Sequence, residues 1–219
     1  MGMKETIEAC VRQTRVVAII RGFDPEVCVR LAEAYVRGGI RLVEVTFPQA
    51  DPDGWVRTTE AIRAIGARFA GDLHVGAGTV LTEQQLTLAQ QAGATYMVTP
   101  NVKPELIRTA VSRGLAALPG AFTPSEAVAA HEAGASFVKL FPAASLGPDY
   151  VKAIRAPLSH ISFLAVGGIS EQNAAAYRAA GCVGVGVGGN LTNRAWIEAG
   201  AWDRIEEMAR KLVEVTAAP

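Results

Sequence analysis

The chain has 219 residues, half of them hydrophobic, and its 21 basic side chains balance 21 acidic ones. This length fits one large domain or two small ones with a sizeable core, and a net charge near zero provides no basic face for nucleic acid. No apolar stretch reaches the roughly 20 residues of a membrane span, so we expect neither nucleic acid nor a membrane as a partner.

The first ten residues lack the apolar middle region of a signal peptide. The three cysteines (Cys10, Cys28 and Cys182) lie far apart and form no disulfide or zinc pattern. We therefore expect a cytoplasmic protein with no metal site and no cofactor.

Along the chain, short apolar runs alternate with helical patterns. A helix is predicted over roughly residues 3–14, and helix starts of the capping-box type are predicted at residues 82–85 (TEQQ) and 123–126 (TPSE). Glycines that would end a helix precede most of the apolar runs. The eight runs span residues 16–20, 41–47, 73–78, 94–99, 115–120, 136–141, 161–168 and 183–189.

Eight strand–helix units without a linker predict an α/β fold, a (β/α)8 barrel with an N-terminal helix, as a single domain over residues 1–219. Near-continuous apolar strands are typical of a parallel sheet that helices cover. A doubly wound open sheet is the alternative.

Two charged residues lie inside predicted strands. Lys139 interrupts the run SFVKLF, and Glu44 interrupts RLVEVTF. Because side chains alternate along a strand, both can point into the mouth of a barrel, where barrel enzymes carry their active sites. An enclosed lysine has a lowered pKa, and its free amine can attack a ketone to form a Schiff base while a carboxylate moves protons.

Two other interpretations of Glu44 and Lys139 stay open. Glu44 and Lys139 could form a buried structural ion pair, within a barrel that only binds a sugar phosphate. The barrel could also be an isomerase that uses acid–base residues without a covalent intermediate.

Glycine pairs follow the last two runs, at Gly167–Gly168 and Gly188–Gly189. They indicate phosphate binding through backbone N–H groups, with simple tight turns as the alternative.

With these residues identified, nearly the whole chain resembles the class I aldolases of 2-keto-3-deoxy-6-phosphogluconate and its galactonate epimer. The matching segments are GGIRLVEVTF, VGAGTVL, FVKLFPA and AVGGI. The resemblance implies that Lys139 forms the Schiff base and that Glu44 is the general acid and base. It also implies that Thr79 holds the pyruvate carboxylate, and that Gly167 and Gly168 contribute to a phosphate site.

Within that family the chain is more similar to the phosphogalactonate branch. AIIRG places Arg21 at the substrate, and VTPN and LGPDYVKAIRA are also similar to that branch. Pro48 stands where phosphogluconate members commonly have an arginine, and Gly189 followed by Asn190 stands where the phosphogalactonate pattern commonly has a serine.

The resemblance implies a metal-free TIM barrel, usually a homotrimer. It implies cleavage of 2-dehydro-3-deoxy-6-phosphogalactonate to pyruvate and D-glyceraldehyde 3-phosphate. The gluconate epimer and 4-hydroxy-2-oxoglutarate are the alternative substrates.

Overall fold

The computed structural model describes residues 2–217. Its strands form one sheet in which every neighbouring pair is parallel, in the order β5-β4-β3-β2-β1-β9-β8-β7-β6. A strand lies in each of the eight predicted runs. The strands are β1 (Val16–Ile20), β2 (Leu42–Thr46), β3 (His74–Gly78), β4 (Tyr96–Val98), β5 (Ala116–Leu118), β6 (Gly120–Ala121), β7 (Val138–Leu140), β8 (Phe163–Val166) and β9 (Gly184–Val187).

The sheet closes on itself through the strands at its two ends. Pro119 alone separates β5 from β6, so the two are successive parts of one strand, interrupted where proline has no N–H to donate. The next strand pairs with both parts, because the Ser136 N–H donates to Ala117 O at 2.9 Å and the Lys139 N–H donates to Pro119 O at 2.9 Å. The predicted (β/α)8 barrel is therefore confirmed, and the open doubly wound sheet is wrong.

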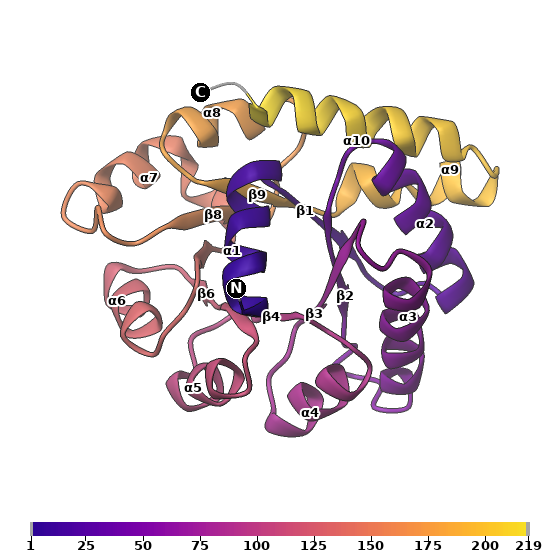
Figure 1. Ribbon diagram of the computed structural model, residues 1–219. Helices are drawn as coiled ribbons and strands as arrows, with labels where there is room; N and C mark the ends of the chain where they lie inside the picture. The colour runs from indigo at the N-terminus through magenta and orange to yellow at the C-terminus, as the bar shows by residue number, and fades with distance from the viewer. Residues whose placement is uncertain (1, 218–219) are drawn as a thin grey trace.

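Helices follow the strands and surround the barrel (Figure 1). Thr82 and Thr123 each accept from the backbone N–H three residues later, and both predicted capping boxes are complete. Within residues 2–217, no helix is long and apolar enough to cross a membrane. The helices are α1 (Met3–Thr14), α2 (Pro25–Arg37), α3 (Gly54–Arg68), α4 (Glu83–Gln91), α5 (Pro104–Ser112), α6 (Pro124–Glu132), η1 (Ala143–Ser145), α7 (Gly147–Arg155), α8 (Ala174–Ala179), η2 (Gly189–Thr192), α9 (Arg194–Glu198) and α10 (Trp202–Ala217).

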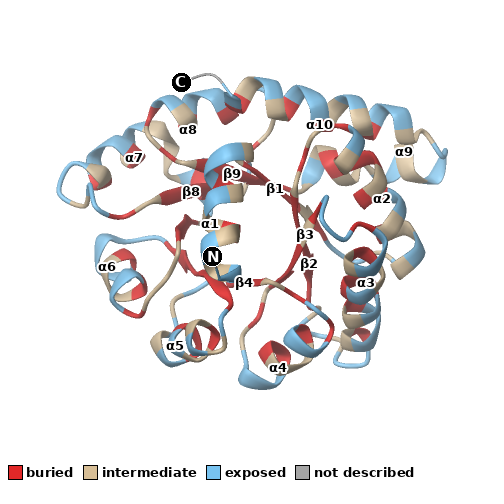
Figure 2. Ribbon diagram, in the orientation of Figure 1, coloured by how far each residue is buried: buried red, intermediate tan, exposed pale blue. Residues whose placement is uncertain are grey.

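Strand alternation divides the buried side chains into two layers. Val43, Val45 and their counterparts on the other strands pack outward against the helices. Leu42, Tyr96 and Phe137 belong to a second cluster, inside the barrel. The buried faces lie on the strands and on the inner sides of the helices (Figure 2).

Helix α1 closes one end of the barrel. Ile7 and Val11 on one of its faces join the interior cluster, and Arg12 donates to Ser162 at the start of β8 at 3.1 Å. Figure 1 looks onto this end, with α1 lying across the opening. Because α1 covers the amino ends of the strands, only the opposite, carboxyl end is left for a ligand.

Candidate active site

Lys139 lies in the middle of β7 and points into the barrel. Its neighbours Val138 and Leu140 face the helices, so the apolar sequence around the lysine belongs to the other side of the strand. The side chain is 7% exposed. Its Nζ atom lies 4.7 Å from the centre of the Phe141 ring, whose face attracts a cation.

Glu44 has the equivalent position in β2 and is 3% exposed. Gly78 of β3 provides space for it. A Cβ atom at Gly78 would lie 2.5 Å from Glu44 Oε1, so any larger residue there would displace the carboxylate. Glycine at position 78 thus leaves the Glu44 carboxylate the place that it occupies inside the barrel.

Burial and neighbouring charges both shift the pKa values of these two groups. Burial lowers the pKa of Lys139, the charge of Glu44 raises it, and the charge of Arg21 lowers it. Burial raises the pKa of Glu44, while the charges of Lys139 and Arg21 lower it. Both shifts bring the two pKa values closer together, which favours a free amine next to a carboxyl group that can exchange protons.

The two side chains influence one another without direct contact. Among residues 2–217, no ion pair within 4.0 Å joins Glu44 to Lys139. A buried structural ion pair would need that direct, hydrogen-bonded geometry to offset desolvation. The arrangement therefore resembles two separate reactive groups more than a structural pair.

A cavity of about 410 Å³ brings most of the predicted site residues together at the carboxyl end of the barrel. Ile19, Phe141 and Thr192 also line it, although the sequence analysis did not single them out. The predicted residues that line it are Arg21, Glu44, Lys139, Gly167, Gly168, Gly188 and Gly189.

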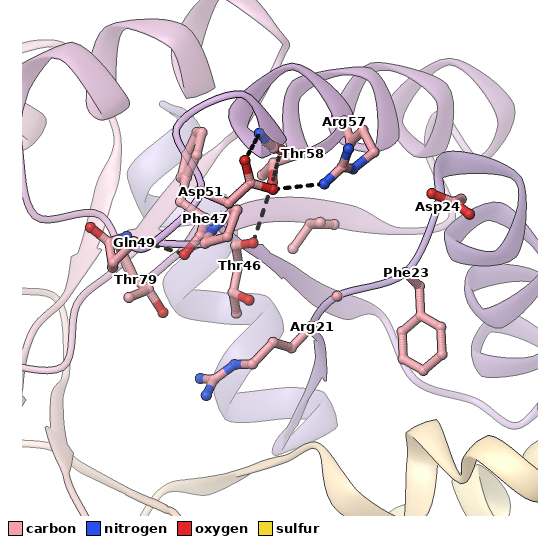
Figure 3. A pocket seen from close by; sticks show the side chains of 14 residues that line it. Arg21, Phe23, Asp24, Thr46, Phe47, Gln49, Asp51, Arg57, Thr58 and Thr79 are labelled. Carbon is pink, nitrogen blue, oxygen red and sulfur yellow. Dashed lines mark hydrogen bonds and ion pairs between the residues drawn. The ribbon is translucent and has the colours of Figure 1, made fainter.

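Thr79 does not line that cavity. It lines an adjoining one of about 470 Å³, together with Thr46 and Arg21 (Figure 3). Arg21 lines both cavities, so the two meet at its side chain. Arg21 is exposed, and among residues 2–217 it forms no ion pair within 4.0 Å. A carboxylate bound between Arg21 and Thr79 would lie where the two cavities join.

The backbone at Thr79 has φ 55°, in the left-handed region that β-branched residues rarely adopt. Gln49 holds this conformation, because its Nε2 donates to Thr79 O at 2.8 Å and to Phe47 O at 3.1 Å. Gln85 in turn donates to Gln49 Oε1 at 3.1 Å. Sequence reasoning missed this support, because a glutamine that contacts a backbone 30 residues away has no local signal.

The two glycine pairs differ in their structural reasons. Gly167 and Gly168 have φ values of 92° and 74°, so glycine is needed for the turn itself. Gly188 has φ −110°, and nothing lies within 4 Å of the position that a Cβ at Gly189 would occupy. The fold therefore does not require glycine at position 189, where the backbone borders the cavity.

Three of the four glycine carbonyls are held by hydrogen bonds. Gly167 O accepts from the Ala144 N–H at 3.0 Å, and Gly168 O accepts from Asn173 Nδ2 at 2.9 Å. Gly188 O accepts from both the N–H and Oγ1 of Thr192, at 3.0 and 3.1 Å. Asn190 Nδ2 donates to Glu171 Oε2 at 2.7 Å, so this amide is already engaged.

The fold and these cavities define a (β/α)8-barrel protein with an enclosed lysine and carboxylate that line a cavity at the carboxyl end of the barrel. Within residues 2–217, no cluster of three His, Cys, Asp or Glu side chains is placed to hold a metal ion. Residues 7–208 match the aldolase family described as KDPG and KHG aldolase. The chain belongs to this family and is an aldolase, which is a type of lyase.

Individual relatives support the same classification. The chain is 42% identical over 176 residues to a probable 2-dehydro-3-deoxy-6-phosphogalactonate aldolase of Rhizobium meliloti (strain 1021), covering 80% of each chain. It is 39% identical over 176 residues to the 2-dehydro-3-deoxy-6-phosphogalactonate aldolase of Escherichia coli (strain K12), covering 80% of this chain and 83% of the relative. A solved native KDPGal structure superposes with a TM-score of 0.82 at 35% identity, covering 92% of this chain and 94% of that one.

Proposed function

We propose that residues 1–219 form one Schiff-base aldolase domain that cleaves 2-dehydro-3-deoxy-6-phosphogalactonate to pyruvate and D-glyceraldehyde 3-phosphate. The observation that carries this proposal is the enclosure of Lys139 and Glu44 in one cavity, with burial lowering the pKa of the amine. Two relatives at 42% and 39% identity, both described as aldolases of this substrate, support the choice of substrate.

The chemistry begins at the amine. The lone pair of Lys139 Nζ attacks C2 of the substrate, and loss of water from the carbinolamine leaves a protonated imine. Glu44 removes the proton of the C4 hydroxyl, directly or through water, and the C3–C4 bond breaks. The bonding electrons move into an enamine on Lys139 as the aldehyde departs. Protonation of C3 by Glu44 and hydrolysis of the imine release pyruvate and restore the free amine.

Arg21 and Thr79 hold the substrate carboxylate in this proposal. The exposed guanidinium of Arg21 borders the cavity of Lys139, and Thr79 lines the adjoining cavity that shares Arg21. A guanidinium and a hydroxyl are both donors to a carboxylate, and the guanidinium can bind it through two parallel hydrogen bonds.

The phosphate lies on the backbone of Gly167, Gly168, Gly188 and Gly189. The carbonyl oxygens of Gly167, Gly168 and Gly188 already accept hydrogen bonds within the protein. The backbone N–H groups are therefore the groups that bind the anion. The open space at Gly189 lets a ligand approach its backbone closely. No side-chain hydroxyl stands at position 189, and Asn190 is bound to Glu171, which leaves backbone donors as the main contacts.

Steady-state kinetics with both C4 epimers tests the proposal. We expect a higher kcat/KM for the phosphogalactonate epimer, because the C4 hydroxyl must meet Glu44 and the two epimers present it differently. If kcat/KM for the phosphogluconate epimer or for 4-hydroxy-2-oxoglutarate is equal or higher, that compound is the substrate instead. Preference for an unphosphorylated substrate would make the glycine pairs turns only.

The homotrimer implied by the family resemblance, and the cytoplasmic location expected from the sequence, are part of the same proposal. Light scattering coupled to size-exclusion chromatography of the full chain tests the trimer, since a monomer has a mass of 23.0 kDa. Cell fractionation tests the location.

A further inference from the structure

Tyr96 carries a buried polar atom that has no partner. It lies in β4 on the interior face, its side chain is 0% exposed, and within residues 2–217 its hydroxyl makes no hydrogen bond. The other fully buried tyrosine, Tyr35, donates from its hydroxyl to Leu191 O at 2.9 Å. Because burial of an unpaired hydroxyl is unfavourable, the position of the Tyr96 hydroxyl calls for an explanation beyond packing.

The ring of Tyr96 reaches toward the Glu44 strand. It lies over Gly76, where an added Cβ would be 2.3 Å from Cε2 of the ring. Gly76 is the residue that pairs with Glu44 in the register of β2 and β3. The phenol is thus close to Glu44 inside the barrel, where the charge of Glu44 adds to burial in raising the pKa of Tyr96.

Glu44 has charged neighbours toward the mouth and a neutral donor toward the interior. Lys139 and Arg21 act on it from β7 and from the end of β1. Tyr96 lies on β4, and the titratable groups that act on it are Glu44 and the Cys10 thiol of α1. The Tyr96 ring therefore lies over the residue paired with Glu44, and among the described residues the Glu44 carboxylate has no hydrogen bond of its own.

We propose that Tyr96 is a positioning residue for Glu44, and that the Tyr96 phenol donates a hydrogen bond to the ionised carboxylate across one water. A donor to the charged form lowers the pKa of a carboxyl group. Tyr96 therefore partly offsets the burial of Glu44, keeps more of it ionised at neutral pH and limits its orientations. The proposal rests on the proposed function only for the role that ionised Glu44 has in turnover.

The test measures the titration of Glu44 without using catalysis. Full-length protein labelled with ¹³C at the glutamate carboxyl carbon is titrated by NMR, and the Glu44 signal is assigned from its loss in Glu44→Gln. In Tyr96→Phe we expect the pKa of Glu44 to rise by about one unit, the size expected for one hydrogen bond to a charged group. Tyr35→Phe is the matched control, because it removes a buried hydroxyl elsewhere and should leave the Glu44 titration in place.

A second measurement strengthens the donor instead of removing it. Replacing the four tyrosines with 3-fluorotyrosine makes each phenol more acidic. The Glu44 titration should move to lower pH in the wild-type sequence and stay unchanged in a Tyr96→Phe background. An unchanged Glu44 pKa in both experiments would overturn the proposal. If the NMR shifts appear but no aldolase activity is found, the proposed function fails and the link between Tyr96 and Glu44 stands.

Discussion

Replacing Thr79 with glycine should make the protein more stable and less active. The left-handed φ of 55° at this residue stores strain, which for a non-glycine residue is about 1–2 kcal/mol. Glycine removes the strain but adds about 0.5–1 kcal/mol of chain entropy to the unfolded state. The net gain is about 0–1.5 kcal/mol, which for a chain of this size raises Tm by up to about 6 °C.

The loss of activity comes from the missing hydroxyl. A hydrogen bond to a charged group contributes about 1.5–3 kcal/mol, so kcat/KM should fall by about 10- to 100-fold. The support from Gln49 reaches the backbone carbonyl of Thr79 and is unaffected by the substitution. Activity and stability should therefore change in opposite directions.

Three variants separate the two effects. Thr79→Ala removes the hydroxyl and keeps the strain, so it should lose activity without the gain in Tm. Thr79→Ser keeps the hydroxyl and should retain most activity. The assays are calorimetry and pyruvate release coupled to lactate dehydrogenase. If Thr79→Gly keeps the wild-type kcat/KM, the hydroxyl does not bind substrate. If the Tm of Thr79→Gly is lower than the Tm of Thr79→Ala, the strain argument is wrong.

Further predictions address the mechanism. Pyruvate with borohydride should attach irreversibly to Lys139, as shown by peptide mass mapping, and labelling of Lys103 or Lys152 instead would remove the Schiff-base role. Because burial lowers the pKa of Lys139, the labelling rate should reach its half-maximum below pH 10.5, the ordinary lysine value. That midpoint should fall further in Glu44→Gln, since the carboxylate charge raises the pKa; a midpoint at or above the wild-type value would contradict the coupling. Glu44→Gln should also retain the fold and lose about 10²–10⁴-fold in kcat, whereas near wild-type turnover would limit Glu44 to a structural role. EDTA should leave activity unchanged, because the imine is the electron sink, and a loss that a divalent ion restores would point to a metal-dependent reaction.

Much of the fold could be predicted because its signals are local. The capping boxes at Thr82 and Thr123 depend on side chains three residues apart, and the inward direction of Lys139 follows from alternation along a single strand. Eight apolar runs separated by helical patterns predict parallel strands covered by helices, because only that arrangement buries both faces of each strand. Glu44 and Lys139 could be named as candidates for the same reason.

Other features depend on how the barrel closes. Between β2 and β7 the sheet has three intervening strands, so the distance between Glu44 and Lys139 is decided by closure and not by either strand alone. Closure also places Thr79 in the adjoining cavity, where its strained φ depends on Gln49. The phenol of Tyr96 has no local signal, because an aromatic residue in a strand is ordinarily a packing residue. Its proximity to Glu44 requires the glycine that β3 contributes between them. It therefore depends on how β2, β3 and β4 lie relative to one another, which only the tertiary structure decides.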